Sequence, residues 1–584
     1  MTNIYFSTYR QVFELLTKPK KKRFYYLQVL IVITSLVDLT GLALFVPVIS
    51  AISDRSLLSG DHPLAVLKSW SGVSNSDVFL LALFIAAFVF FLCRSLFVVW
   101  SHWIQTRFIH NLSEDIGRRT YAYFLSNDFE EIQKRDSGRV VRELTISPQH
   151  YAKFLIMPLL LLTSELLILA VIIAGIAWYN LSVFGLLVTT IFPIAYFFHR
   201  ITKTKVKNYG LIQNDLTPEL LMSSTRGVFG IIDVRLRGKE QKLLTDYSKL
   251  MHELNNISVK TSVLAIIPSK LFELSTIGGL LLIFYYGAFI ADDPQIILPL
   301  IALYAAAGYR LVPSLSKILP AFQSLERYSY LFPVFRQALL SNSSDLCSTK
   351  NVNRLEHDIS IEELSFGYKN TSDLLFRNFN FQIKRGEILG LIGKSGSGKT
   401  TLVNIIAGFL LPKSGAIRVD GVTLDADKRA SWMKGISYVQ QTPYLERGTL
   451  GQNIAFLEDE IDFDMLNMAI KMASLTDLVG NRDPNKIMID EQGKNLSGGQ
   501  KQRVIIARAL YHKANLIILD EATSALDNET EEDVNQTVKK LKGSGITIII
   551  VAHRYTTLKY TDRITRLDDG KIVEETTYNK LKSS

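Results

Sequence analysis

The sequence contains little cysteine: two residues in 584, Cys93 and Cys347. Neither has the spacing of a zinc site, and two isolated cysteines make no disulfide framework. Charged residues are also scarce, at 21% of the chain against 48% hydrophobic residues, and the mean hydropathy is +0.18. These shortages argue against a zinc protein and a disulfide-stabilised secreted protein, and they indicate a greasy part joined to a soluble part.

The first 23 residues lack the features of a cleavable signal peptide, because no small-residue cleavage site follows a short apolar core. Five apolar side chains recur there at helical spacing, which predicts an amphipathic helix on a membrane surface. They are Tyr5, Tyr9, Val12, Phe13 and Leu16. The basic cluster over 18–23 then precedes the first long apolar run, a pattern that predicts a cytoplasmic N-terminus.

The chain has no excess of acidic residues, and its formal net charge is +10. Such a charge suits either a nucleic acid or an anionic membrane surface. No basic patch with interleaved aromatic residues occurs, as a nucleic-acid-binding surface would need. We therefore expect membrane lipid and no nucleic acid among the partners.

Six apolar runs approach the roughly 20 residues that a helix needs to cross a bilayer. They lie at about 24–52, 78–104, 154–178, 181–200, 261–287 and 296–316. The connections 179–180 and 288–295 contain no Lys or Arg, whereas 105–153 and 201–260 contain many, so both termini are expected in the cytoplasm. We expect an all-α transmembrane domain over 1–340 whose helices continue beyond the bilayer. The alternative is a large soluble protein with buried core helices.

Charged residues inside these runs are candidates for contact with a transported substrate. Facing lipid would cost each about 2.5–3.5 kcal/mol at the helix centre, so such groups face a cavity or find a partner. The candidates are Arg310 first, then Arg94 and Lys270. The alternative is pairing or snorkelling, and Lys270 lies three residues before Glu273 on one helical face. Pro313 is expected to kink or break its helix.

A change of composition separates the two halves of the chain. Residues 341–358 lack apolar periodicity and predict a linker. Over 359–584, short apolar strands alternate with helices and glycine turns, the pattern of an α/β nucleotide-binding domain.

The segment 388–400 has the clearest chemical signal. A five-residue apolar run predicts a buried strand, and the next eight residues fit G-x-x-x-x-G-K-[ST]. The glycines let backbone N–H groups surround phosphate oxygens, Lys399 reaches the β/γ-phosphates, and the Thr400 hydroxyl suits Mg²⁺. The predicted nucleotide-binding residues here are Gly393, Lys394, Ser395, Gly396, Ser397, Gly398, Lys399, Thr400 and Thr401.

Two further motifs follow in order. Residues 516–519 predict a buried strand that ends in Asp520, which can hold Mg²⁺, and Glu521, which can polarise the attacking water. The run Ser497, Gly498, Gly499 and Gln500 precedes a helix-forming segment whose N-terminus suits a γ-phosphate. One nucleotide has little use for a second such site in its own domain, so Ser497 is expected to serve another chain.

Together, the phosphate loop, the Leu496–Gln500 pentapeptide and the Asp-Glu strand resemble the ABC transporter family. The resemblance implies that Tyr368 stacks on adenine, that Gln441 contacts Mg²⁺, and that His553 contacts the γ-phosphate. It also assigns 524–527 to a loop that crosses a dimer. Taken singly, Tyr368 and His553 are more compatible with core packing; their order among the other motifs favours the functional assignment.

The family resemblance implies an exporter-type half-transporter that acts as a homodimer in the bacterial cytoplasmic (inner) membrane. ATP and Mg²⁺ would be its cofactors, and Glu521 and His553 its catalytic residues. Turns near 137–147 and 222–233 are expected to dock on the nucleotide domains.

Three stretches are similar to bacterial flippases of polyprenyl-pyrophosphate-linked oligosaccharides: 157–166, 230–235 and 309–314. Physically, this function needs cations in the cavity to receive a pyrophosphate, with Arg310 the first candidate. We expect flipping of a lipid-linked or amphipathic substrate of this kind. A lipid or multidrug exporter is the alternative, and a non-transport ABC ATPase is disfavoured by the six apolar runs.

Overall fold

The structure is a computed structural model that describes residues 2–53, 63–73, 75–289, 297–340, 355–369, 373–522 and 528–583. The chain divides into two compact units. The first comprises Met1–Asn127 and Lys134–Ser343, and the second comprises Asp128–Gln133 and Ser344–Ser584.

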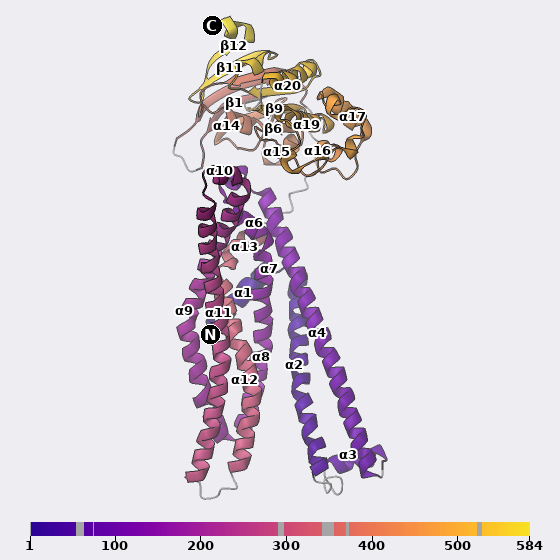
Figure 1. Ribbon diagram of the computed structural model, residues 1–584, viewed down its shortest axis with the longest axis vertical. Coiled ribbons are helices and arrows are strands. Elements are labelled where there is room, and N and C mark those ends of the chain that lie inside the picture. Colours follow the sequence, from indigo (N-terminus) through magenta and orange to yellow (C-terminus); the bar gives the residue numbers. More distant parts are fainter. Residues whose placement is uncertain are drawn as a thin grey trace. The chain divides into compact units, whose positions relative to one another are not determined.

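The first unit is helical throughout its described residues. Its helices are α1 (Thr2–Leu15), α2 (Lys18–Ser53), α3 (Pro63–Ser71), α4 (Ser76–Ser126), α6 (Ser137–Thr145), α7 (Ser147–Tyr151), α8 (Met157–Tyr179), α9 (Leu181–Phe229), α10 (Ile231–Leu236), α11 (Glu240–Phe289), α12 (Ile297–Tyr328) and α13 (Leu331–Leu340). A π-helical turn, Ala152–Ile156, joins α7 to α8. Helices α8, α9, α11 and α12 pack together, and α2 packs against α4 (Figure 1).

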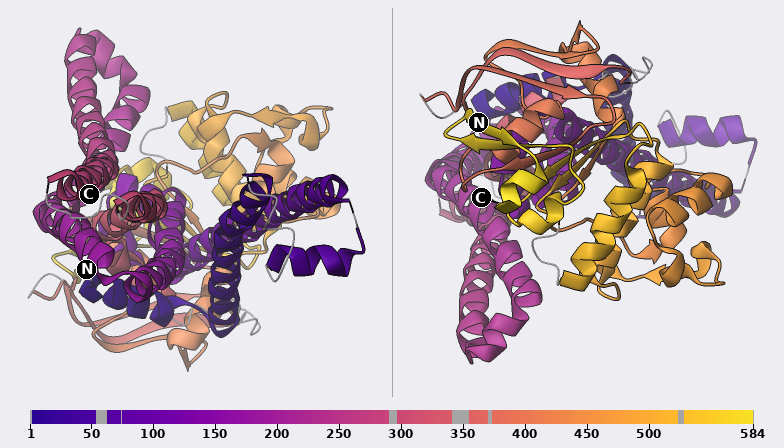
Figure 2. Two further views of the ribbon diagram at one scale, coloured as in Figure 1. Left: turned by 90° about the horizontal axis from the view of Figure 1, so that it is seen from below. Right: turned by 90° about the horizontal axis from the view of Figure 1, so that it is seen from above.

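The long helices extend well past the length of one membrane crossing, as predicted. Helix α4 has 51 residues, α9 has 49 and α11 has 50, whereas a crossing needs about 20. In all views α9 and α11 lie side by side, joined through α10 (Figure 2). Helix α12 runs unbroken through Pro313, so this proline does not end the helix.

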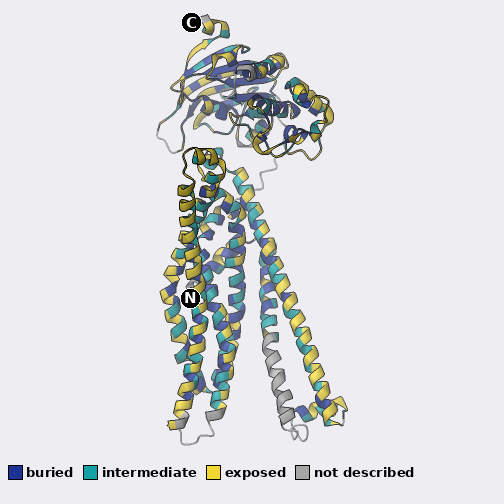
Figure 3. Cartoon of the chain, in the orientation of Figure 1, coloured by how far each residue is buried: buried dark blue, intermediate teal, exposed yellow. Residues whose placement is uncertain are grey.

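Four described helical stretches are long and apolar enough to cross a membrane: Ser76–Ser126, Ser147–Tyr179, Leu181–Phe229 and Glu240–Tyr286. They match four of the six predicted runs. The runs at 24–52 and 296–316 lie partly outside the residues whose side chains are described, and they stay predictions. Many apolar side chains on these helices are exposed, including Phe88 at 70% and Leu281 at 63% (Figure 3). Apolar surface of this extent is unfavourable in water, which indicates that lipid covers it.

The second unit is α/β. Its large sheet has the order β12-β11-β3-β10-β9-β6, and its small antiparallel sheet has the order β2-β1-β4-β5. The large sheet comprises β3 (Ile388–Ile392), β6 (Ile436–Val439), β9 (Leu516–Asp520), β10 (Thr547–Val551), β11 (Arg563–Asp568) and β12 (Lys571–Thr576). The small sheet comprises β1 (Asp358–Phe366), β2 (Phe376–Lys384), β4 (Ser414–Val419) and β5 (Val422–Thr423), and β7 (Gly448–Thr449) pairs with β8 (Met488–Ile489).

The second unit also contains a series of helices. They are α14 (Lys399–Ile406), α15 (Ala426–Lys434), α16 (Leu450–Ile454), α17 (Phe463–Met472), α18 (Thr476–Val479), α19 (Gly498–Tyr511), α20 (Asn528–Leu541) and α21 (Tyr578–Ser583). Strands β3 and β10 are buried at every position, so they read as continuous apolar runs rather than as alternating patterns.

The second unit also includes α5 (Phe129–Lys134), which lies between α4 and α6 in the sequence. The Phe129 ring stacks on Phe409 at 4.8 Å, and the Lys369 backbone N–H donates to Glu130 at 3.1 Å. The two turns that we expected to dock on the nucleotide domain, near 137–147 and 222–233, belong to the first unit, and their docking stays a prediction. The segment Asp128–Gln133, which belongs to the second unit, precedes the first of these turns in the sequence.

A buried carboxylate fastens the loop after β10 to α20. Glu531 is 3% exposed and accepts hydrogen bonds from Arg554, Thr556 and Thr557, the last at 3.0 Å. His553 begins this loop, so Glu531 braces the segment that follows the histidine.

Replacing this carboxylate should destabilise the second unit. Glu531→Ala removes three hydrogen bonds to a buried carboxylate, which costs about 3 kcal/mol and lowers the melting temperature of that unit by about 5–10 °C. The neighbouring Glu532 is the control, because its side chain is 44% exposed and bonds only to Gln536, at 2.6 Å, and Lys559, at 3.5 Å, among the contacts described. Calorimetry of the full chain measures both; equal shifts for Glu531→Ala and Glu532→Ala would contradict the bracing role.

Candidate nucleotide-binding site

The phosphate loop joins β3 to α14 and can be built only with glycine at key positions. Gly393 has φ 152°, and a Cβ there would lie 2.1 Å from the Leu567 carbonyl oxygen. Gly398 has φ 102° and caps α14. The Lys399 side chain folds over the loop, where its Nζ donates to the carbonyls of Gly393 at 2.9 Å and Lys394 at 3.0 Å. The Lys399 ammonium group therefore binds two carbonyl groups at the start of the loop.

Polar groups of the loop differ in their exposure. Thr400 is exposed in the first turn of α14, as are Lys394, Ser395 and Gly396 in the loop. The Ser397 hydroxyl is buried and has no hydrogen-bond partner among the described residues. The Tyr368 hydroxyl lies 2.9 Å from that of Thr401, so Tyr368 is held beside the loop. Exposed amides at a helix N-terminus and an unpaired hydroxyl suit a phosphate.

A second set of groups follows the strands beside β3. Strands β3, β10, β9 and β6 are neighbours and run parallel, so the residues after them meet at one edge of the sheet. That edge places Gly393, His553, Asp520, Glu521 and Gln441 in one region. Gln441 is exposed, two residues beyond β6.

Asp520 has one oxygen bound and one oxygen without a partner. The Tyr438 hydroxyl donates to Oδ2 at 2.7 Å, and Oδ1 is buried with no hydrogen-bond partner among the described residues. Burial raises the pKa of Asp520 above its usual value, and the bond from Tyr438 opposes that rise. An orphaned carboxylate oxygen of this kind fits a divalent cation, because Mg²⁺ prefers carboxylate ligands.

Glu521 and His553 form a pair. Glu521 Oε1 lies 2.8 Å from His553 Nε2, and the Glu521 backbone has φ 51°, which is unusual outside glycine. The Glu521 N–H donates to the Val551 carbonyl at 3.0 Å, which fixes it against β10. Burial lowers the pKa of Lys399, and the charges of Glu521 and Asp520 oppose this shift. The arrangement can hold a phosphate between one cation and a carboxylate–imidazole pair.

Ser497 caps α19 and is exposed. Its Oγ accepts from the Gln500 N–H at 3.2 Å, and the Gln500 side chain accepts from the Ser497 N–H at 2.9 Å. This reciprocal cap uses the Gln500 side chain, while Ser497 and Gly498 remain on the surface and Gly499 is buried. Such a surface suits the nucleotide of another chain. The predicted loop 524–527 lies outside the described residues.

Tyr438 is the site residue that the sequence interpretation missed. Its strand shows an apolar run, and only the pairing of β6 with β9, which sets Tyr438 opposite Ile518, brings the hydroxyl to Asp520. A tyrosine in a strand gives no signal of that kind.

The three candidate substrate cations lie on different helices of the first unit. Arg310 lies on α12 and Lys270 on α11, helices that pack together, whereas Arg94 lies on α4 over the Phe91 ring at 5.4 Å. Lys270 pairs with Glu273 at 2.8 Å, the alternative that its spacing suggested. The Arg310 Nε is buried and has no hydrogen-bond partner among the described residues.

Comparison with known proteins decides the fold. Residues 376–524 match the ABC transporter family model. A solved bacterial Atm1-family ABC exporter with ATP bound aligns with 97% of this chain and 96% of its own, at a TM-score of 0.75 and 19% identity. The chain has the fold of an ABC exporter. The predicted fold class, an all-α transmembrane domain followed by an α/β nucleotide-binding domain on one chain, is confirmed.

Curated relatives match part of this chain. The ATP-dependent lipid A-core flippase of Ralstonia nicotianae is 39% identical over 236 residues, 40% of each chain. The leukotoxin translocation ATP-binding protein LktB of a Pasteurella haemolytica-like species is 38% identical over 39% of this chain and 32% of its own. The leukotoxin export protein LtxB of Aggregatibacter actinomycetemcomitans is 30% identical over 56% and 46%, respectively. The match thus spans less than half the length of each relative.

The hydrogen bond between Tyr438 and Asp520 predicts a pH-dependent defect. Tyr438→Phe removes a bond to the charged carboxylate, so the pKa of Asp520 rises further and the site loses Mg²⁺ at a higher pH. The Mg²⁺ concentration for half-maximal ATPase activity should increase about 10-fold, and the acidic limb of the pH profile should move upward. Tyr444→Phe is the control, since Tyr444 is 64% exposed. An unchanged pH profile in Tyr438→Phe would refute the link.

Proposed function

We propose that the chain is one half of a homodimeric ABC exporter that hydrolyses ATP with Mg²⁺ to move a substrate across the bacterial inner membrane. The observation that carries this proposal is the shared sheet edge, where Lys399, Asp520, Glu521 and His553 follow neighbouring parallel strands or the loop between them. The exposed apolar helices of the first unit support a membrane location.

The residues at this sheet edge have different roles. Lys399, together with loop amides, neutralises phosphate charge, and Thr400, Gln441 and the free Oδ1 of Asp520 hold the cation. Bound Mg²⁺ supplies charge stabilisation of the transferring phosphoryl group. Glu521 orients the attacking water, and its bond to His553 keeps both side chains in position.

Two chains are needed because Ser497 and Gly498 are exposed at the N-terminus of α19 and form no part of the edge described above. In the homodimer, the Ser497–Gln500 segment of each chain would meet the γ-phosphate held by the other. Closure then depends on ATP, since ATP would bind the closed dimer better than the open one.

The substrate proposal rests on the exposed face of α12. Arg310 and Lys317 are seven residues apart, so they lie on one face about two turns from each other. Tyr309 on the same side is 72% exposed. Lys317 pairs with the nearly buried Glu165 at 2.7 Å, whereas no carboxylate within the described residues pairs with Arg310. Arg310 is therefore the cation on this face that is available to a pyrophosphate.

We therefore propose a polyprenyl-pyrophosphate-linked oligosaccharide as the substrate. A lipid or multidrug exporter remains the second candidate, because relatives of this chain carry names for both lipid A-core and leukotoxin transport. ATP-dependent flipping of a labelled lipid-linked oligosaccharide in proteoliposomes distinguishes the two. No movement despite normal ATPase activity would favour the second candidate.

Glu521→Gln should abolish turnover. The amide cannot take a proton from the attacking water, and a positioned base contributes about 10²–10⁴-fold, so ATPase activity should fall below about a tenth of wild type with nucleotide binding retained. Glu491→Gln, an exposed change just after β8, should leave ATPase activity near normal. Turnover above a tenth in Glu521→Gln would show that another group activates the water.

Arg310→Ala should reduce flipping with little effect on basal ATPase activity. A charge-assisted contact to pyrophosphate is worth about 1.5–3 kcal/mol, so initial flipping rates should fall roughly 10- to 100-fold. Lys270→Ala provides the matched control, because Glu273 already neutralises Lys270 on the exposed surface of α11. Intact flipping in Arg310→Ala would remove Arg310 from the substrate site.

A further inference from the structure

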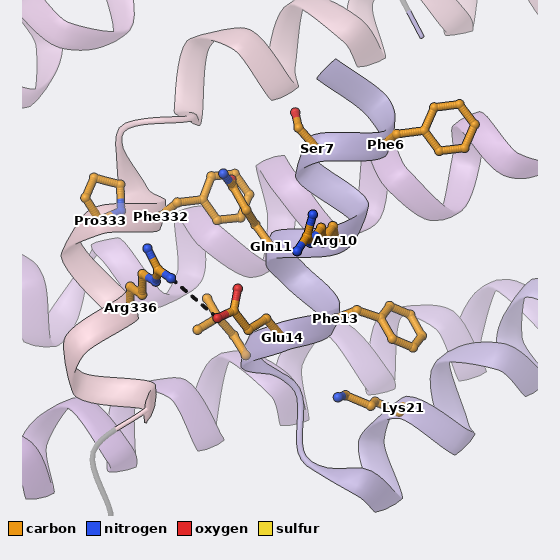
Figure 4. Close-up of a pocket in the computed structure, with 11 residues that line it drawn as sticks. Phe6, Ser7, Arg10, Gln11, Phe13, Glu14, Lys21, Phe332, Pro333 and Arg336 are labelled. Atoms are coloured by element: carbon orange, nitrogen blue, oxygen red, sulfur yellow. Dashed lines mark hydrogen bonds and ion pairs between the residues drawn. The ribbon is translucent and has the colours of Figure 1, made fainter. Parts of the chain in front are cut away.

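A basic hollow lies between α1 and α13 in the first unit. Its volume is about 1030 Å³, and its walls come from α1, the start of α2, and α13 (Figure 4). Ligand pockets commonly have volumes of about 300–1,000 Å³, so the hollow is large enough for a lipid headgroup with its glycerol. We call it the α1–α13 hollow.

Positive charge dominates the α1–α13 hollow. Arg10, Lys21 and Arg336 line it together with one carboxylate, Glu14. Glu14 lies 3.5 Å from Arg336, and the two side chains are 45% and 67% exposed. An ion pair this exposed is weak. No carboxylate within the described part of the chain pairs with Arg10, and Lys21 lies 5.8 Å from the centre of the Phe13 ring. Two cations are thus left for a ligand.

Aromatic surface accompanies the charge. Phe6 and Phe13 line the hollow, and Phe6 is 66% exposed. Figure 4 shows both rings on the same helix as Arg10. A site for a free anion has no use for an exposed phenyl ring such as that of Phe6. Rings next to cations suit a ligand whose anionic group continues into glycerol and acyl chains.

The walls of the hollow are held in place before any ligand binds. The opposite face of α1 is buried, with Val12 and Leu16 in one core with Phe24 and Phe335. Arg119 of α4 donates to the Leu15 carbonyl at 3.3 Å and also to the Leu339 carbonyl, so it joins the ends of α1 and α13. A preformed site binds without the entropy loss of ordering its walls.

The sequence position of the hollow places it at a membrane surface. Lys21 lies three residues before the predicted membrane run 24–52, and the basic cluster over 18–23 faces the cytoplasm in the predicted topology. A basic pocket at the cytoplasmic end of membrane helices is where acidic lipid headgroups bind. This step depends on α2 crossing the membrane and not on the transported substrate.

We propose that the α1–α13 hollow binds the headgroup of an anionic phospholipid from the cytoplasmic leaflet. Arg10 and Lys21 contact the phosphate, and Arg336 leaves Glu14 to pair with the phosphate as well. Phe6 and Phe13 contact the glycerol and the upper acyl carbons. The lipid thereby bridges α1 and α13, the last described helix before the second unit's first strand.

Binding of dioctanoyl phosphatidylglycerol to the purified full-length protein in a neutral detergent tests this proposal. Each lost cation near an acidic headgroup weakens binding about 5-fold, so Arg10→Ala/Arg336→Ala should bind about 25-fold more weakly by native mass spectrometry. Arg10→Lys/Arg336→Lys keeps both charges and should stay within about 3-fold of wild type. Dioctanoyl phosphatidylcholine should bind far more weakly to all of them.

Lys18→Ala/Arg23→Ala is the matched control, because both residues are exposed and basic but line no part of the hollow. An equal loss in this control would show general surface attraction and overturn the proposal. Displacement of the lipid by equimolar inorganic phosphate would overturn it too, since it would reveal an anion site only. Arg310→Ala should bind the lipid normally. A negative flipping assay would therefore contradict the proposed transported substrate, whereas a negative lipid-binding assay would contradict the proposed site in the α1–α13 hollow. Melting curves establish that each variant is folded. If the double variant Arg10→Ala/Arg336→Ala is not folded, the single variant Arg10→Gln is used for the binding test instead.

Discussion

Parallel pairing of β3, β10, β9 and β6 is the constraint on which the nucleotide site depends. Each strand delivers its functional groups just beyond its carboxyl end, and the ladder sets these ends side by side. Buried apolar side chains hold the strands in this order, with β3 and β10 buried at every position. A slip of one strand would move its polar groups away from the phosphate loop, so the hydrophobic core determines the geometry of the charged site.

The nucleotide site keeps buried polar groups available for a ligand. Most buried polar atoms have partners, yet Asp520 Oδ1 and the Ser397 hydroxyl have none among the described residues. Tyr438 occupies the other oxygen of Asp520 and so orients the free one. Glu531 shows the opposite case, since three donors fully engage a carboxylate that serves the fold. The carboxylate with an unpaired oxygen is thus available to bind a cation, whereas the fully hydrogen-bonded carboxylate stabilises the fold.

Charge in the first unit follows a related division. Glu165 and Lys317 neutralise each other, as do Lys270 and Glu273 on the surface of one helix. Arg310 is less compensated, and so is the α1–α13 hollow, where three cations share one carboxylate. These two places lie on different helices and are proposed to meet different ligands: a transported pyrophosphate on α12 and a resident phospholipid between α1 and α13.

Local sequence determined the motifs and the class of each half. The phosphate loop needs glycines at particular backbone angles, long apolar runs need lipid, and buried strands need apolar side chains, so these features are visible without a structure. The strand after which each motif falls was likewise predictable, as with Asp520 after 516–519. Tertiary structure decided which side chains meet. The Tyr438–Asp520 bond, the Glu165–Lys317 pair and the place of Asp128–Gln133 in the second unit each join residues far apart in the chain. Such contacts depend on strand order and helix packing, and no local pattern of residues encodes them.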